Sequence, residues 1–173
     1  MPNKRIVIIG PESTGKSTLS QALADALGTL WVPEYARTYL ETINRPYEES
    51  DLLEIAKGQL AAEDAAAEIT NGPLICDTDL NVIKVWSEHK YHRCNNFITS
   101  QIEVRRYDLY LLTGIDLPWQ PDPLREHPDE TMRQYFYNIY KHIVAQSGVP
   151  WFPVNGNESE RLEKALGYIQ LIK

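Results

Sequence analysis

One stretch of the sequence decides the fold: residues 5–17, which read RIVII followed by GPESTGKS. The first five residues are mostly β-branched and apolar, as in a buried strand. The next eight match G-x-x-x-x-G-K-[ST], a glycine-rich loop whose backbone N–H groups cradle phosphates. Apolar residues at helical spacing follow and end at Gly28. Strand, loop and helix in this order predict a phosphate-binding βα unit.

The rest of the chain alternates short apolar runs with amphipathic ones. Further strands are expected at 29–32, 74–76, 109–112 and 151–154, and further helices at 52–69, from 80 onward, at 132–143 and at 162–169. This alternation is typical of a parallel sheet with helices on both faces. We therefore expect an α/β fold of the P-loop NTPase type with a five-stranded parallel sheet. One domain would span residues 1–173, with a lid at about 113–133, where a proline-rich stretch precedes a helix.

Composition excludes several classes of protein. With 17 basic and 24 acidic residues among 173, the net charge is −7, which disfavours nucleic acid as a partner. No apolar run approaches the ~20 residues of a membrane span, and the four apolar residues 6–9 are too few for a signal peptide. Two cysteines cannot build a disulfide framework, so we expect a reducing, cytoplasmic location. The sequence leaves the oligomeric state open.

The glycine-rich loop predicts ATP and Mg²⁺ as ligands, although the sequence does not decide between ATP and GTP. Lys16 would reach the β- and γ-phosphates, and the Ser17 hydroxyl would bind the metal. A carboxylate beside phosphates is unfavourable, so the Glu12 side chain is expected to point away from them. The residues expected at the nucleotide are Gly10, Glu12, Ser13, Thr14, Gly15, Lys16, Ser17 and Thr18.

Carboxylates follow two of the predicted strands, where ligands bind in such sheets. Asp77 stands where a metal-binding aspartate is expected. Asp79 could belong to the site or cap the next helix. Glu34 could bind a substrate hydroxyl and take its proton, or be an ordinary solvated residue at a helix start. The choice of base between Glu34 and Asp77 stays open, and we favour Glu34 because Asp77 is better used on the metal.

Arginines near the expected lid could spread the charge of a transferring phosphoryl group. Arg125 and Arg133 flank the proline-rich segment, and either could instead be a surface residue. Arg37 could bind phosphate or pair with a carboxylate.

Other side chains are weaker candidates. Five aromatic residues near predicted strand ends and loops could stack on a flat base: Trp31, Tyr35, Trp86, Tyr91 and Trp119. The aromatic stripe at 135–140 is interpreted as core packing. His89, His92 and Cys94 lack a fourth ligand at metal spacing, so we predict no zinc site there.

Four motifs together resemble the ribosylnicotinamide kinase domain of NadR-type NAD-synthesis proteins: GPESTGKS at 10–17, PEYAR at 33–37, CDTD at 76–79 and YDL at 107–109. Their order and rough spacing fit along nearly the whole chain. The resemblance implies a nucleoside-kinase-like fold and transfer of the ATP γ-phosphate to the 5′-hydroxyl of nicotinamide riboside, giving nicotinamide mononucleotide. By the same analogy, Asn155 and Gly156 would lie near the adenine.

Two departures from the family pattern matter. Pro33 stands where a tryptophan is expected to stack on the nicotinamide ring, so Trp31 or Tyr91 would take that role. The resemblance thus implies a substrate site of Trp31, Glu34, Tyr35, Arg37, Asp79 and Tyr91. The chain also lacks the nucleotidyltransferase and DNA-binding portions of full NadR proteins, which predicts a stand-alone kinase.

Alternatives are a kinase for another nucleoside or small molecule, or a regulatory P-loop ATPase. Against the latter, the chain contains no Asn-Lys-x-Asp motif, and Thr78 rather than glutamate follows Asp77.

Overall fold

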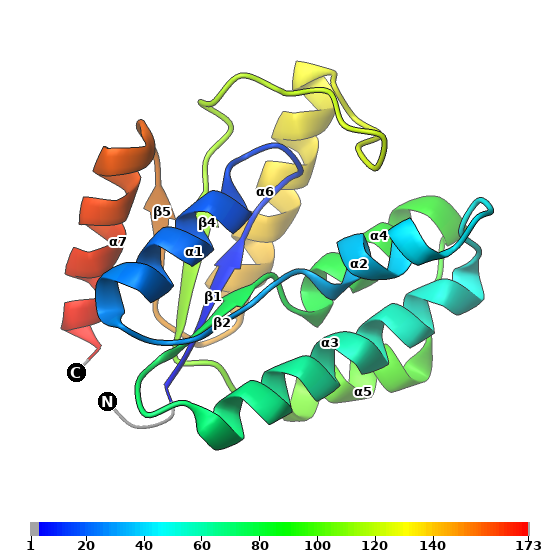
Figure 1. Ribbon diagram of the computed structural model, residues 1–173. Coiled ribbons are helices and arrows are strands. Elements are labelled where there is room, and N and C mark those ends of the chain that lie inside the picture. Colours follow the sequence, from blue (N-terminus) through cyan, green and yellow to red (C-terminus); the bar gives the residue numbers. More distant parts are fainter. Residues whose placement is uncertain (1–3, 173) are drawn as a thin grey trace.

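A computed structural model describes residues 4–172 of the chain. Within that range five parallel strands form one sheet in the order β2-β3-β1-β4-β5 (Figure 1). The strands are β1 (Arg5–Ile9), β2 (Trp31–Val32), β3 (Leu74–Asp77), β4 (Leu109–Thr113) and β5 (Trp151–Val154). β1 is central and pairs with both β3 and β4. The predicted five-stranded parallel sheet is confirmed, and the glycine-rich loop leaves it from the middle strand.

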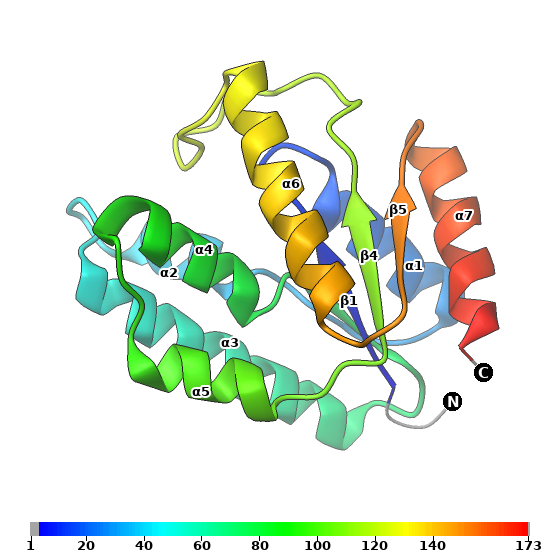
Figure 2. The same ribbon diagram turned by 180° about the vertical axis from the view of Figure 1, so that it is seen from behind.

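Helices cover both faces of the sheet. α1 (Lys16–Leu27) and α7 (Glu158–Leu171) lie on one face, and α6 (Glu130–Gln146) lies on the other (Figures 1 and 2). α2 (Tyr35–Thr42), α3 (Glu49–Ile69), α4 (Leu80–Tyr91) and α5 (Asn96–Val104) gather to one side of the sheet. No helix among residues 4–172 combines the length and the apolar character that crossing a bilayer requires.

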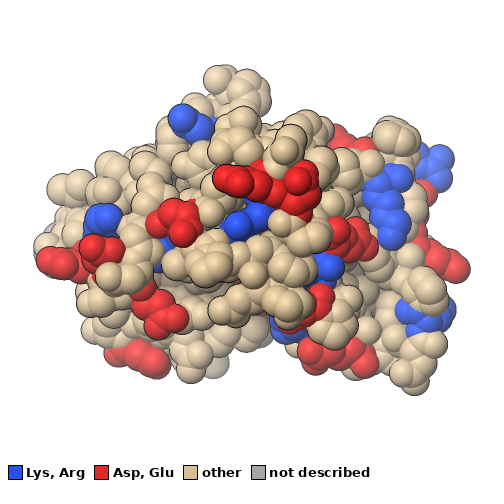
Figure 3. Space-filling view, turned by 90° about the horizontal axis from the view of Figure 1, so that it is seen from above, with Lys and Arg blue, Asp and Glu red and all other residues tan. Residues whose placement is uncertain are grey.

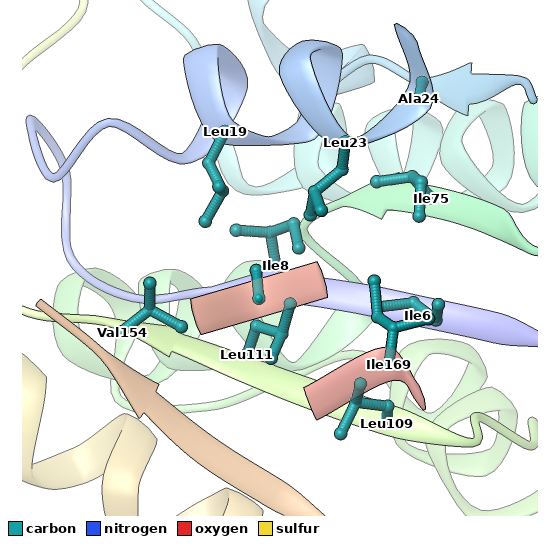
Figure 4. Packing of buried hydrophobic residues seen from close by; sticks show 11 residues of the cluster. Ile6, Ile8, Leu19, Leu23, Ala24, Ile75, Leu109, Leu111, Val154 and Ile169 are labelled. Atoms are coloured by element: carbon teal, nitrogen blue, oxygen red, sulfur yellow. The ribbon is translucent and has the colours of Figure 1, made fainter. Parts of the chain in front are cut away.

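Alternate residues of the strands build two cores. Ile6 and Ile8 of β1 are fully buried in the cluster beneath α1 and α7, with Leu23 among their neighbours (Figure 4). Val7 and Ile9 point the other way, into the cluster that α6 covers. Because both faces are covered, the strands are continuously apolar rather than alternating.

The sequence did not indicate every element. α2 and α5 were not expected, and β2 is only two residues long. α3 begins before the expected residue 52, because Glu48 and Asp51 form a capping box at its start. A third core cluster, which includes Ile55 and Ile83, joins α2 to α5. Of these four helices, α2 and α4 line the cavity described below.

Candidate functional site

The loop at residues 10–15 requires glycine at both ends. Gly10 has φ +153°, and a Cβ there would lie 2.4 Å from Thr113 Oγ1 of β4. Gly15 has φ +77° and caps the N-terminus of α1 without a side chain. The backbone therefore wraps closely around a hollow, and the first turn of α1 directs its N–H groups into it.

Side chains fix the loop from within. The buried Thr14 hydroxyl lies 2.7 Å from the Pro11 carbonyl and 2.7 Å from Thr113 Oγ1, which ties the loop to β4. Lys16 Nζ donates to the Pro11 carbonyl at 2.7 Å and lines the cavity beside the loop. Thr18 is exposed on α1 and does not line that cavity.

Ser17 and Asp77 meet at the end of β3. The Ser17 hydroxyl donates to Asp77 Oδ2 at 2.5 Å, and the aspartate is only 1% exposed. Burial, reinforced by the charge of Glu34 and opposed by Lys16, raises the Asp77 pKa to about 6. Its second oxygen, Oδ1, is buried and lacks a hydrogen-bond partner among residues 4–172.

These two residues fit Mg²⁺. The metal prefers oxygen ligands and commonly binds proteins through one or two side chains, keeping waters and substrate phosphates as its other ligands. An unpartnered carboxylate oxygen next to a serine hydroxyl supplies such a donor set. No group of three or more His, Cys, Asp or Glu side chains suited to a metal occurs in the described range, so a closed metal cage is not present there.

A cavity of about 200 Å³ lies between the glycine-rich loop, the start of α2, α4, α6 and the loop over residues 114–129. Glu34 and Arg37 of α2 line it, and Glu34 caps that helix without a side-chain capping bond. The rest of its lining includes a largely apolar and aromatic wall, made by Ala36, Leu40, Val82, Val85, Trp86, His89, Phe136 and Tyr140. A polar, phosphate-binding end thus adjoins an apolar compartment.

Sequence analysis missed much of that wall. Val82, Val85, Trp86 and His89 are spaced i, i+3, i+4, i+7 and form one face of α4. That spacing was a detectable signal, but it equally describes a core-facing helix. The stripe at 135–140 has a double role, because Phe136 and Tyr140 are core residues that also line the cavity.

Four of the five expected stacking residues do not line this cavity: Trp31, Tyr35, Tyr91 and Trp119. Trp31 packs in the cluster beneath α1 and α7, and Tyr91 packs among α2 to α5. The Tyr35 ring lies against Gly58 of α3. Trp86, a weaker candidate from the sequence, does line the cavity, and its Nε1 donates to Tyr47 Oη at 2.6 Å. The expectation for Trp31 and Tyr91 is therefore corrected, because both side chains are used in packing elsewhere.

Asp79 acts as a helix cap. It is 1% exposed, accepts from the backbone N–H of Asn81 at 3.0 Å and accepts from Tyr110 Oη at 2.8 Å. Its carboxylate is thus occupied within the fold and does not line the cavity. Of the two alternatives, the structure supports capping and corrects the substrate-binding expectation.

The segment 114–129, between β4 and α6, arches over the glycine-rich loop where the lid was expected (Figure 1). The Glu12 carboxylate accepts from the backbone N–H groups of Glu126 and His127. Arg37 pairs with Asp122 of the lid at 3.1 Å. Glu12 therefore points toward the lid.

The two arginines expected near the lid, Arg125 and Arg133, differ. Arg125 lines the cavity, and its Nη1 donates to the Gln120 carbonyl at 2.5 Å. Arg133 does not line the cavity and is only 7% exposed. It donates to the Leu117 carbonyl at 2.9 Å and the Ser13 carbonyl at 3.3 Å, and burial lowers its pKa. In this structure Arg125 is the better placed of the two for contact with substrate.

Asn155 and Gly156 follow β5 and are held by neighbouring loops rather than lining the cavity. The Gly156 N–H donates to Asp116 at 2.6 Å. The buried Arg161 of α7 donates to the carbonyls of Thr14 and Gly156 and pairs with Asp116 at 2.6 Å. Sequence analysis missed Arg161, since an arginine in an amphipathic helix is usually solvated.

The face at the carboxyl ends of the strands, viewed in Figure 3, carries mixed charges. Acidic and basic side chains alternate across the part of this face that the structure describes, and no continuous basic stripe is visible there.

Sequence comparison identifies relatives along nearly the whole chain. The trifunctional NAD biosynthesis/regulator protein NadR of Salmonella typhimurium (strain LT2) is 28% identical over 174 residues, covering 98% of this chain and 42% of the relative. NadR of Escherichia coli (strain K12) is 27% identical over 176 residues, with the same shares. The chain thus spans less than half the length of these curated relatives. The resemblance inferred from the four motifs is confirmed.

Structural comparison confirms the P-loop, nucleoside-kinase-like fold. A crystal structure of NadR in complex with NR superposes with a TM-score of 0.80 at 22% identity, covering 99% of this chain and 52% of that one. Thymidylate kinase from Ehrlichia chaffeensis gives 0.71 at 12% identity, covering 98% of this chain and all of the other. A family model described as an AAA domain, AAA_28, matches residues 5–161. The chain therefore belongs to the AAA_28 family of P-loop domains.

Proposed function

We propose that this protein is an ATP-dependent kinase that phosphorylates the 5′-hydroxyl of nicotinamide riboside to give nicotinamide mononucleotide. One observation carries the proposal: a single cavity is lined by the phosphate-binding loop, by apolar and aromatic side chains, and by the carboxylate-bearing Glu34. The similarity to NadR, a relative solved with NR bound, supports the choice of substrate.

The residues of the loop suit the donor. Lys16 would neutralise the β- and γ-phosphates, and the N–H groups of residues 10–17 would surround them. Ser17 and Asp77 would hold Mg²⁺, which when bound supplies neutralisation of phosphate charge. Phosphoryl transfer depends mainly on positioning and charge stabilisation, and these groups provide both.

The residues of the compartment suit the acceptor. Glu34 would accept a hydrogen bond from the 5′-hydroxyl and take its proton, while Arg125 would stabilise the transferring group. Trp86, whose ring is fixed by its bond to Tyr47, is the aromatic residue we propose to stack on the base. Nicotinamide riboside carries a positive ring, which the carboxylates of Glu34 and Glu126, both in the lining of the cavity, would favour.

The test measures ADP formation by purified protein with Mg²⁺·ATP and a panel of nucleosides, with product identity from mass spectrometry. We expect nicotinamide riboside to be the preferred acceptor. Lys16→Ala should lower kcat/KM about a thousandfold, since an ion pair at ~4 Å contributes about 4 kcal/mol at an effective dielectric near 20.

Other results would replace the proposal. If a different nucleoside is phosphorylated preferentially, the protein is still a kinase but its proposed substrate is wrong. ATP hydrolysis that no nucleoside accelerates would favour a regulatory ATPase. Absence of any ATP turnover above the Lys16→Ala control would reject the kinase altogether.

We also propose a cytoplasmic location, because both cysteines, Cys76 and Cys94, are unpaired, as suits a reducing compartment.

A further inference from the structure

Glu12 is an anomaly of the phosphate-binding loop, because a carboxylate there faces a bound polyanion. The structure shows where that carboxylate goes. Glu12 Oε1 accepts the Glu126 N–H at 3.0 Å and also accepts the His127 N–H. Both donors are consecutive backbone groups of the lid, far away in the sequence. Two N–H dipoles aimed at one carboxylate offset its charge and make it tolerable at this position.

The next residue of the loop makes a second attachment. Ser13 has a positive φ of +56°, uncommon for a residue with a side chain. In this conformation its hydroxyl accepts the Gln120 N–H at 2.8 Å. The lid is thus held at two points, residues 120 and 126–127, by consecutive side chains of the nucleotide loop.

Arg125 lies between these two attachments. It immediately precedes the N–H groups that Glu12 binds, and its own Nη1 donates to the Gln120 carbonyl. The backbone on both sides of Arg125 is therefore hydrogen-bonded to the glycine-rich loop. These hydrogen bonds fix the position of the Arg125 guanidinium relative to phosphates bound by that loop.

We propose that Glu12 is a positioning residue that latches the lid to the phosphate-binding loop, and so sets Arg125 over the transferring group and keeps water out. The inference rests on the proposed kinase function for its catalytic consequence. The latch itself is a structural statement that can be tested without turnover.

The first experiment measures amide hydrogen exchange at Glu126 and His127 in wild type, Glu12→Ala and Glu12→Gln. Alanine removes the acceptor, and we expect exchange at both amides to increase about tenfold or more. In Glu12→Gln the exchange rates should fall between those of wild type and Glu12→Ala, because glutamine keeps an acceptor oxygen but carries no charge. Glu41→Ala, at an exposed glutamate of α2, is the matched control and should leave both amides unchanged.

The second experiment compares nucleoside phosphorylation with ATP hydrolysis in the absence of acceptor. Glu12→Ala should lower kcat for transfer about tenfold and raise the share of ATP lost to water, because an arginine over the phosphoryl group is worth ~10³-fold or more when correctly placed. Glu12→Gln should recover part of both effects. The KM for the nucleoside should change little.

Each contrary result has a definite meaning. Unchanged exchange at Glu126 and His127 in both variants rejects the latch. If exchange becomes faster but the share of ATP lost to hydrolysis is unchanged, Glu12 does not position Arg125. A raised nucleoside KM with normal kcat assigns Glu12 to acceptor binding and overturns the proposal. If wild type phosphorylates no nucleoside, the proposed function fails, while the exchange result still decides the latch. Should Glu12→Ala not fold, Glu12→Gln carries both measurements.

Discussion

Asp77, which we propose to hold the metal, is a single residue whose burial opposes stability. Its carboxylate is buried at the end of β3, near the carboxylate of Glu34, and one oxygen has no partner within the described chain. Its pKa of about 6 exceeds the ordinary 3.8, so the folded state binds the proton more tightly than the unfolded state. Stability from this group is complete below pH 3.8 and is lost as the pH rises through about 6.

Asp77→Asn should therefore stabilise the ligand-free protein at pH 8 while abolishing its activity. The shift from 3.8 to about 6 is about two pKa units at about 1.4 kcal/mol each, so the gain is on the order of 3 kcal/mol, or roughly 6–12 °C in Tm. Thermal unfolding followed by circular dichroism at pH 8 and pH 4.5 measures it. The difference between variant and wild type should shrink at pH 4.5, where the aspartate is mostly protonated. Equal differences at both pH values would show that ionisation of Asp77 is not the cause.

At the scale of elements, the contact between α2 and α3 positions part of the site. Gly58 lies inside α3, and a Cβ there would approach Tyr35 Cε1 of α2 to 2.1 Å. The two helices can pack closely only because residue 58 lacks a side chain. α2 follows Glu34 directly and carries Arg37, so any displacement of this helix moves both residues relative to the phosphate-binding loop.

Gly58→Ala is expected to destabilise the protein and to lower kcat/KM. Alanine inside a helix normally stabilises by about 1 kcal/mol relative to glycine, but overpacking at Tyr35 costs about 1–3 kcal/mol. Gly167→Ala is the matched control, because Gly167 lies within α7 and a Cβ there would meet no neighbouring element within 4 Å. Chemical denaturation should show a gain of ~0.5–1 kcal/mol for the control with unaltered kinetics. Similar gains in both variants would refute tight packing at Gly58.

Across the whole molecule, the sheet was predictable and part of the helical layer was not. All five strands are short apolar runs, and burial of both faces leaves that pattern plain in the sequence. α5 follows a stretch of polar residues, 92–96, that shows no apolar period before Phe97. α2 is only eight residues long and has one buried residue, Ala36, so it offers about two turns in which a helical repeat could be recognised.

The residues of the site likewise differ in how far the sequence could predict them. The loop at 10–17 and Asp77 were recognisable because local chemistry at a strand end dictates their residue types. The aromatic wall was recognisable only in part, because Trp86 was one of five stacking candidates whereas Phe136 and Tyr140 were interpreted as core packing alone. Which aromatic residues reach the cavity depends on how α4 and α6 pack. Arg161 joins three loops distant in sequence, a role that no local pattern encodes. Tertiary contacts, rather than motifs, therefore select many of the residues that line the cavity.

The arrangement of the cores predicts that the chain unfolds as one unit. The two clusters on either side of the sheet share β1, β3 and β4 through alternate residues, so neither face can lose its packing alone. α3 contributes Ala62 and Ala66 to one of these clusters and Ile55 to the third, which couples the helical wall to the sheet. Calorimetry should show one transition whose calorimetric and van't Hoff enthalpies agree.

A non-hydrolysable ATP analogue with Mg²⁺, at about 100 times its Kd, should move that whole transition by roughly 5–10 °C, and Lys16→Ala should weaken the shift. Two transitions, of which the nucleotide moves only one, would show that α2 to α5 form a separate cooperative unit.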